Sequence, residues 1–386
     1  MLKLHTKSNL PIGRVSLSAP AILRVTENPS YPEALRSRSA LRVNQKSREH
    51  PQGFGAYLVG GDLSLPDTVE NAFRTAPELD YLSEGDVIKV SPSGAISTIY
   101  RRHANVNFLL VTERCNSFCV MCSQPPRDVD DDYLIDDYLR AIRLFDQSTP
   151  ELMITGGEPT LLGDRFVGLV RSIKSFLPRT AIHVLTNGRN FKDLSLCARV
   201  AAVDHPDIMY GIPIYSDVPA IHDFVVQADG AFDETTRGIL NLKRHSQRVE
   251  LRVVVHKYTS ERLEKLATFI VRNLQFVDHV ALMGLEPTGF GKSNYTDLWI
   301  DPIEYQGVLS RAVTILDRAG IRTSIYNHQL CVLSEAVRKF AVKSISDWKR
   351  EYLGVCRGCA VLDRCGGFFS SALERHSDHI RPLSVA

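Results

Sequence analysis

The sequence predicts an α/β fold, in which a parallel sheet is wound with helices and preceded by a small, mainly β region. From about residue 105, apolar stretches of strand length alternate with stretches of helix length, the pattern of a parallel sheet. The first apolar stretch, 106–111, leads directly into a loop with three cysteines. The carboxyl end of a strand is where α/β barrels keep their chemistry, so this loop is the expected site.

Residues 1–104 are expected to form the first domain, a mainly β N-terminal extension. Short β-like pieces alternate there with turn residues, and residues 53–62 are rich in glycine. Residues 85–100 have the alternation and the central turn of a β-hairpin.

Residues 105–300 are expected to form the second domain, with six strands and their connecting helices. The expected strands are 106–111, 151–155, 181–186, 208–214, 249–255 and 279–284. The expected helices lie near 133–146, 163–176, 191–201, 232–245 and 260–273. Residues 301–386 form the expected third domain. It begins with a helix over 302–319, since Asp301 suits the N-cap and Pro302 the first helical position.

The composition is that of a globular protein, with 44% hydrophobic and 23% charged residues among 386. No run approaches the ~18 apolar residues of a membrane span, and the N-terminus lacks the apolar core of a signal peptide. We therefore expect a cytoplasmic protein without a membrane partner. The net charge of +2 gives no general case for nucleic-acid binding. Eight cysteines without an export signal favour metal binding over disulfides.

The central motif is a short loop in which Cys115, Cys119 and Cys122 are spaced C-x3-C-x2-C. Cysteine thiolates are the usual ligands of iron–sulfur clusters. A four-iron cluster takes four ligands and this loop offers three, so one iron would stay open to a ligand that is not protein. An open position marks a catalytic rather than a structural metal site. A zinc site, or three unrelated buried thiols, is the alternative.

This spacing resembles that of the radical S-adenosylmethionine (SAM) superfamily. The resemblance implies a partial (β/α)6 barrel and a 4Fe–4S cluster held by Cys115, Cys119 and Cys122, with SAM chelating the open iron. In that superfamily one electron cleaves SAM to methionine and a 5′-deoxyadenosyl radical, which takes a hydrogen atom from the substrate. The three cysteines are therefore the expected catalytic residues.

The second expected strand ends in Gly156, Gly157, Glu158 and Pro159, which match the superfamily's GGEP motif. The resemblance implies that the backbone and the glutamate bind the amino group of SAM. Glycines let the backbone approach a ligand closely, and a carboxylate can pair with an ammonium group. An ordinary β-turn is the alternative.

Further SAM contacts are implied at the ends of the later strands. Asn187 and Ser216 are the expected partners of the ribose hydroxyls and the carboxylate, although Asn187 also suits a turn and Ser216 a helix cap. Arg252 is a candidate partner of the SAM carboxylate, with a structural ion pair as the alternative. The strand 280–284 would lie near adenine or serve as a plain core strand. Met121 stands where relatives have an aromatic residue, and its thioether can pack on adenine.

Two other patterns do not carry the function that they suggest. Gly289 to Ser293 resembles the end of a phosphate-binding loop, but that motif needs a glycine where Glu286 stands. Six aspartates between 128 and 137 lack the spacing of a calcium loop. Two of them can cap the following helix, and contact of this acidic loop with a basic peptide is the minority interpretation.

A second cysteine group lies in the last domain, at Cys331, Cys356, Cys359 and Cys365. Its spacing resembles a shortened auxiliary-cluster segment of the SPASM and twitch families. The SPASM pattern continues with a cysteine where Phe369 stands, so one auxiliary 4Fe–4S cluster is expected rather than two. Tetrahedral zinc is the alternative, and His328 is an alternative ligand to Cys331. The remaining cysteine, Cys197, is expected to be a small buried apolar residue.

Three segments resemble the His-Xaa-Ser system radical SAM maturases of the HxsC type. They are Leu110 to Pro126 (LVTERCNSFCVMCSQPP), Met283 to Gly289 (MGLEPTG) and Cys365 to Phe369 (CGGFF). The resemblance implies modification of a peptide rich in His-Xaa-Ser, a partner radical SAM protein and a reductant for the cluster. A radical SAM enzyme acting on a small molecule or RNA, and a non-catalytic metal-binding protein, are the rival functions.

Overall fold

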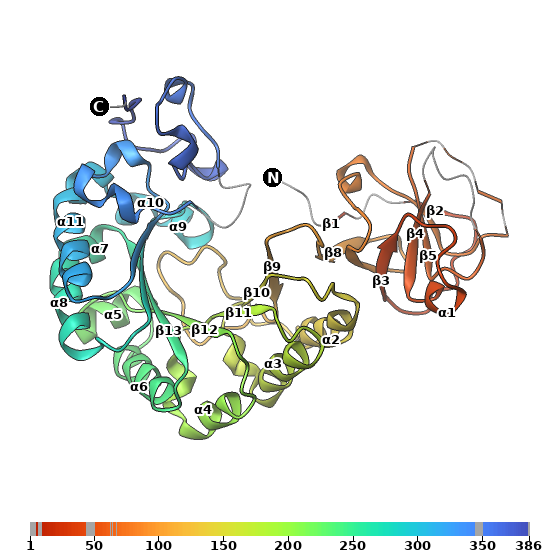
Figure 1. Ribbon diagram of the computed structural model, residues 1–386, viewed down its shortest axis with the longest axis horizontal. Coiled ribbons are helices and arrows are strands. Elements are labelled where there is room, and N and C mark those ends of the chain that lie inside the picture. Colours follow the sequence, from red (N-terminus) through yellow and green to blue (C-terminus); the bar gives the residue numbers. More distant parts are fainter. Residues whose placement is uncertain are drawn as a thin grey trace. The chain divides into compact units, whose positions relative to one another are not determined.

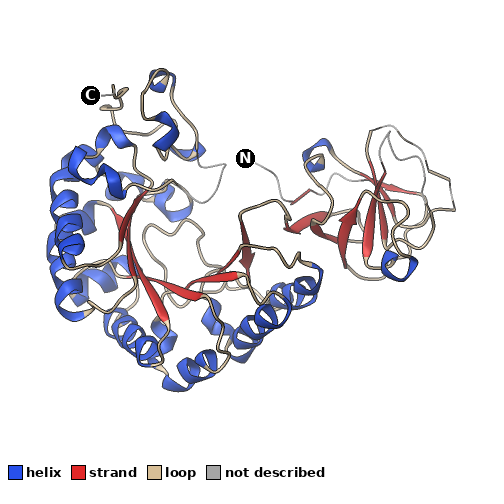
Figure 2. Ribbon diagram, viewed as in Figure 1, coloured by secondary structure: helices blue, strands red, loops and turns tan. Residues whose placement is uncertain are grey.

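The computed structural model divides into two compact units, each described here by itself (Figures 1 and 2). It describes residues 5–6, 10–43, 51–343 apart from 62, 64 and 67, and 350–384. The first unit comprises 1–109, 132–153 and 168–181, and the second comprises 110–131, 154–167 and 182–386. The expected division at residues 104 and 300 stays a prediction. Within the described residues no helix is long and apolar enough to cross a membrane.

The first unit contains an eight-stranded sheet of order β1-β8-β7-β3-β4-β5-β6-β2. The strands are β1 His5–Thr6, β2 Leu10–Ile12, β3 Ala21–Thr26, β4 Ser39–Val43, β5 Ala56–Val59, β6 Ala72–Arg74, β7 Val87–Val90 and β8 Ile96–Tyr100. The predicted hairpin is confirmed as β7 and β8, which pair antiparallel. Sequence reasoning did not predict that β3, β4, β5 and β6 pair in parallel with one another. A single short helix, α1 Glu33–Arg36, lies between β3 and β4.

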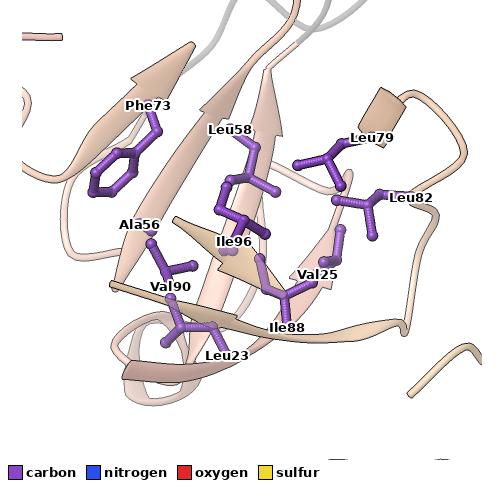
Figure 3. Close-up of a cluster of buried hydrophobic side chains, with 11 residues drawn as sticks. Leu23, Val25, Ala56, Leu58, Phe73, Leu79, Leu82, Ile88, Val90 and Ile96 are labelled. Carbon is purple, nitrogen blue, oxygen red and sulfur yellow. The ribbon is translucent and has the colours of Figure 1, made fainter. Parts of the chain in front are cut away.

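The core of this sheet is built from alternate residues of its strands (Figure 3). Leu23 and Val25 of β3 and Ile88 and Val90 of β7 point into one buried cluster. A strand turns successive side chains to opposite faces, so residues two apart share the core face. Each such side chain contributes about 1.5–3 kcal/mol when fully buried, which explains why so short a set of strands is stable as a mainly β region.

The second sheet has seven strands in the order β15-β14-β13-β12-β11-β10-β9. Its strands are β9 Val106–Leu110, β10 Glu151–Thr155, β11 Ala181–Leu185, β12 Ile208–Pro213, β13 Arg248–Val255, β14 His279–Gly284 and β15 Thr323–Tyr326. The pairs from β11 to β15 are all parallel. The six predicted strands are confirmed, and β15 is a seventh that was not predicted.

The expected helices are present with small differences at their ends. They are α2 Tyr133–Ala141, α3 Asp164–Phe176, α4 Leu194–Ala201, α6 Ala231–Arg244, α8 Leu263–Asn273 and α11 Pro302–Arg318. Four shorter helices were not predicted: α5 Pro219–Val226, α7 Lys257–Ser260, α9 Gly289–Ser293 and α10 Tyr295–Leu298. The start of α11 is as predicted, because the Asp301 side chain accepts a hydrogen bond from the Ile303 N–H at 2.9 Å. Asp132 is the N-cap residue of α2, although its side chain makes no capping hydrogen bond.

The strand β13 shows how the parallel sheet separates its two faces. Val249, Leu251 and Val253 are fully buried, and Figure 2 shows helices lining one side of the curved sheet. The intervening residues Glu250 and Arg252 therefore point to the opposite, inner face. Figure 1 shows the loop that follows β9 on this inner side.

Candidate functional site

The three cysteines after β9 are partly buried, and their thiols lie near enough to interact electrostatically. Burial, together with the neighbouring Cys122 and Cys115 thiols, raises the pKa of Cys119 to about 12. Burial and the Glu158 carboxylate raise the pKa of Cys115 to about 11. Three adjacent thiolates here need a positively charged group between them, so the donor set fits a thiolate-bound iron–sulfur cluster.

The cysteine loop is held from outside by backbone and side-chain hydrogen bonds. The N–H groups of Phe118 and Val120 donate to the carbonyls of Val226 and Val225, at the end of α5 (3.0 and 2.9 Å). Phe290 N–H donates to the Cys122 carbonyl at 2.8 Å. The Asn294 amide donates to the Val120 carbonyl at 2.8 Å. The loop is therefore a fixed part of the fold.

The segment 289–293, which resembles a phosphate-binding loop, has this supporting task. Gly289 has φ +53°, and a Cβ there would lie 2.5 Å from the Cys122 carbonyl oxygen. Only glycine allows α9 to begin so close to the third cysteine. The sequence signal was the pair Gly289 and Gly291, which had no assigned role.

Asp131 braces the residues that lead into the cysteine loop. Its buried carboxylate accepts from the Thr112 hydroxyl at 3.0 Å and from the Glu113 N–H, and pairs with Arg114 Nε at 3.2 Å. Asp131 therefore supports the residues before the cysteine loop. Neither sequence interpretation of the acidic cluster, helix capping or contact with a basic peptide, included this role.

The two glycines of the GGEP motif are explained by their contacts within the chain. A Cβ on Gly156 would lie 2.4 Å from the Thr112 carbonyl oxygen, and one on Gly157 would lie 2.2 Å from that of Arg114. The N–H groups of Gly157 and Glu158 donate to these same two carbonyls, each at 2.8 Å. The motif therefore packs directly against the residues before Cys115, and its contact with SAM stays a prediction.

Glu158 is completely buried and ties neighbouring loops together. Its Oε1 accepts from the N–H and hydroxyl of Thr160 and, at 2.7 Å, from the Thr186 hydroxyl. Its Oε2 accepts from the Asn187 N–H at 2.6 Å. Burial raises the pKa of Glu158, and these donors act in the opposite direction. Oε2 accepts a single bond, so it keeps acceptor capacity for one more donor.

Asn187 and Arg189 hold the cysteine loop from the end of β11. The Asn187 amide donates to Asn116 Oδ1 at 2.6 Å, and its nitrogen lies 3.9 Å from Cys115 Sγ. Arg189 Nη1 donates to the Asn116 carbonyl and, at 3.2 Å, to the Ser117 hydroxyl. Asn187 Oδ1 also accepts from the Arg189 N–H at 3.0 Å, so the turn that the sequence left open is present.

Arg189 and its acidic partner were missed by sequence reasoning. Arg189 Nε donates to Glu234 at 2.7 Å, and Glu234 lies in the first turn of α6. Glu234 also pairs with Lys192. No sequence signal links an arginine after a strand to a loop 73 residues earlier.

Ser216 and Arg252 have the local partners that the sequence left open as alternatives. The fully buried Ser216 hydroxyl accepts from the Val218 N–H at 3.1 Å, just before α5. Arg252 Nη1 donates to Glu250 at 2.6 Å, and Nη2 lies 3.3 Å from Met283 Sδ. Glu250 also pairs with His279 at 2.6 Å. Direct contacts of Ser216 and Arg252 with SAM stay predictions.

Met121 is 6% exposed and packs in an apolar cluster against which Cys119 and Val120 of the loop also pack. Its partners there include Tyr215, Val225 and Leu298. The aromatic Tyr215 thus lies in the same cluster as the methionine that replaces an aromatic residue. The contact between Met121 and adenine stays a prediction.

The second cysteine group lines one small cavity that is partly open to solvent. Cys331, Cys356, Cys359 and Cys365 all line it. His328 does not, because its Nε2 bonds the Tyr305 hydroxyl and its Nδ1 the Tyr326 carbonyl, both at 2.8 Å. Both ring nitrogens of His328 thus have hydrogen-bond partners, which favours Cys331 as the ligand.

The eighth cysteine belongs to neither group. Cys197 is fully buried on α4, and its thiol donates to the Phe191 carbonyl at 3.2 Å. The expected buried apolar role is confirmed.

Comparison with known proteins identifies the domain that carries the cysteine loop. Residues 109–270 match the family model described as the radical SAM superfamily, whose members use a 4Fe–4S cluster and SAM. No curated protein matches the chain. The fold is similar to that of solved radical SAM proteins.

Three of these structures illustrate the likeness. SuiB of Streptococcus suis bound to SAM has 14% identity and a TM-score of 0.48 over 66% of this chain, and the match spans 56% of SuiB, about half its length. The protein anSMEcpe with bound SAM and the peptide Cp18Cys has 16% identity and a TM-score of 0.49, covering 72% of this chain and 92% of that one. A radical SAM methyltransferase from Sphaerobacter thermophilus has 14% identity and a TM-score of 0.44, covering 62% and 72%.

Proposed function

We propose that this chain, which carries a radical SAM domain over residues 109–270, is an enzyme that reductively cleaves SAM and modifies a ribosomally made peptide or protein. The observation that carries the proposal is the gathering of Cys115, Cys119 and Cys122 in one partly buried, rigidly held loop. Three thiols leave one position of a four-iron cluster for SAM.

Some residues around the loop hold its backbone in place, and others are available to bind SAM. When bound, the cluster and SAM supply one electron and a 5′-deoxyadenosyl radical that takes a hydrogen atom from the substrate. Asn187 and Arg189 hold the loop at Asn116 and Ser117. Glu158 positions Asn187 and keeps acceptor capacity on Oε2, which suits the amino group of SAM.

The other proposed SAM contacts lie in the same compact unit. They are Met121, Gly156, Gly157, Asn187, Ser216 and Arg252. Arg252 Nη1 donates to Glu250, whereas Nη2 lies against the Met283 thioether. Nη2 can therefore donate to the carboxylate of SAM.

We propose that Cys331, Cys356, Cys359 and Cys365 hold one auxiliary 4Fe–4S cluster. All four line one cavity, and cysteine thiolates are the usual ligands of such clusters, with tetrahedral zinc as the alternative. Anaerobically purified protein should carry about eight irons and eight sulfides per chain, four of each for each cluster. Stoichiometric zinc with half that iron would contradict the auxiliary cluster and leave the SAM site standing.

The peptide substrate is proposed from the three segments that resemble the His-Xaa-Ser maturases. The test is an anaerobic reaction with SAM, dithionite and a synthetic peptide of His-Xaa-Ser repeats, followed by mass spectrometry. The matched control peptide has alanine in place of every histidine and serine. A mass change confined to the repeat peptide is expected, with or without the partner radical SAM protein. If 5′-deoxyadenosine forms while neither peptide changes, a small molecule or RNA becomes the substrate class.

A further inference from the structure

The four-cysteine cavity is lined in part by a segment that supplies no cysteine, Ile380–Leu383. Ile380 and Arg381 are among the residues that line it. Leu383 N–H points at Cys359 Sγ at 3.4 Å, and the Leu383 carbonyl accepts from the Ala360 N–H at 2.8 Å. This reciprocal pair attaches the segment to the loop that carries three of the four thiols.

A second contact joins the same segment to the fourth thiol. The backbone of Arg381 is hydrogen-bonded to Cys331, which follows β15. The two donors therefore reach thiols from parts of the chain 28 residues apart, positions 331 and 359. Pro382, which has no N–H of its own and a fixed φ, stands between them.

N–H groups directed at sulfur have a known effect on iron–sulfur clusters. Reduction potential is set in part by hydrogen bonds to the sulfurs and by exposure to solvent. A donor N–H stabilises the more negative, reduced form and so raises the potential. Groups of this kind around a metal site also strengthen metal binding, typically by about 10–100-fold.

We propose that Ile380–Leu383 is a strap that completes the auxiliary site, with the Arg381 and Leu383 N–H groups bonding Cys331 and Cys359. The strap keeps water from the metal, slows its loss and raises the reduction potential of the bound cluster. This inference rests on the proposed metal-binding role of the four cysteines.

The test compares Leu383→Pro, which deletes the N–H, with Leu383→Ala, which keeps it. Both are made in the full-length chain with Cys115, Cys119 and Cys122 replaced by alanine, so that the C-terminal group alone contributes signal. We measure metal release to a chelator, and the midpoint potential by redox titration with electron paramagnetic resonance. Leu383→Pro should release metal about 10–100-fold faster and titrate at a lower potential, while Leu383→Ala behaves as the parent.

Two results would overturn the strap. One is equal release by Leu383→Pro and the parent. The other is equally fast release by Leu383→Ala, which would assign the effect to side-chain packing. Arg381→Pro against Arg381→Ala repeats the comparison at Cys331, in case Leu383→Pro fails to fold by circular dichroism. If the parent holds zinc, the proposed auxiliary cluster and the effect on its potential both fail, whereas the release rates still decide whether the strap slows metal loss.

Discussion

Arg189 brings a positive charge to the cysteine loop and binds the loop's backbone at Asn116. Its guanidinium is oriented by Glu234, which is shared with Lys192. It also opposes the rise in the pKa of the Cys119 thiol that burial and the other two thiols produce. The same charge would favour the more negative, reduced form of a cluster bound by the three cysteines.

We expect Arg189→Gln to lower the midpoint potential of the SAM-binding cluster and to speed iron release about 10–100-fold. The measurement is a redox titration of the anaerobic protein together with iron release to a chelator. Lys192→Ala is the matched control, because Lys192 also pairs with Glu234 but, among the described residues, makes no hydrogen bond or ion pair with the cysteine loop. Equal potentials for Arg189→Gln and Lys192→Ala would show that the Arg189 charge does not act on the cluster.

Glu158→Ala should destabilise the protein as well as weaken SAM binding. The substitution leaves the buried donors of Thr160, Thr186 and Asn187 without their acceptor, at about 1–3 kcal/mol for each group that stays unsatisfied. Glu158→Gln keeps the shape and one acceptor oxygen, so its loss of thermal stability should be smaller. Unchanged melting temperatures for both variants would mean that water replaces the carboxylate and that Glu158 is not a brace.

At the scale of elements, the carboxyl ends of the strands assemble the site and short helices close around it. The cysteine loop follows β9, and α5 and α9 each hold its backbone. The approach of α9 to Cys122 depends on Gly289. Its role can therefore be tested apart from the cysteines themselves.

Gly289→Ala should displace the loop and reduce the iron content of the SAM-binding site. The added Cβ would lie 2.5 Å from the Cys122 carbonyl oxygen, and the left-handed φ adds about 1–2 kcal/mol of strain. Gly230→Ala is the control, since Gly230 also has a positive φ but has nothing within 4 Å of the added atom. Gly230→Ala introduces the backbone strain without the close contact, so comparing the iron content of the two variants separates the two effects. If the two variants lose iron equally, α9 does not shape the loop.

The strands and longer helices were predictable because their signals are local. Six buried runs of strand length and six helical stretches correspond to observed elements. The strand β15 was missed because Thr323–Tyr326 is four residues long and mixes polar with apolar residues. The helix α5 was missed because Pro219–Val226 is an eight-residue, largely apolar run without a clear polar face. The conformations of β15 and α5 therefore depend on packing against the rest of the fold, which local sequence does not show.

The cysteines were predictable from spacing, whereas their supports were not. Arg189, Asn294 and Leu383 contact cysteine-bearing loops from positions that are 73, 174 and 24 residues away in the sequence. Each of these three contacts has a backbone atom as one partner, which residue type does not reveal. Glu158 was identified by its motif, but its burial and its hydrogen bonds follow only from the fold.

At the scale of the whole molecule, the chain carries two cysteine groups that differ in their number of thiols. The loop group has three thiols, and the C-terminal group has four around one cavity. A cluster with four protein ligands has no iron free for SAM, whereas one with three has an open position. Cleavage of SAM should therefore depend on the loop group alone.

The measurement that tests this account most directly is 5′-deoxyadenosine formation from SAM with dithionite under anaerobic conditions. Three chains are compared: the parent, the triple variant with Cys115, Cys119 and Cys122 replaced by alanine, and the double variant with Cys356 and Cys359 replaced by alanine. Cys197→Ala controls for loss of a cysteine outside both groups. The account predicts formation by the parent, the double variant and Cys197→Ala, and none above background by the triple variant. Formation by the triple variant at the parent's rate would contradict it.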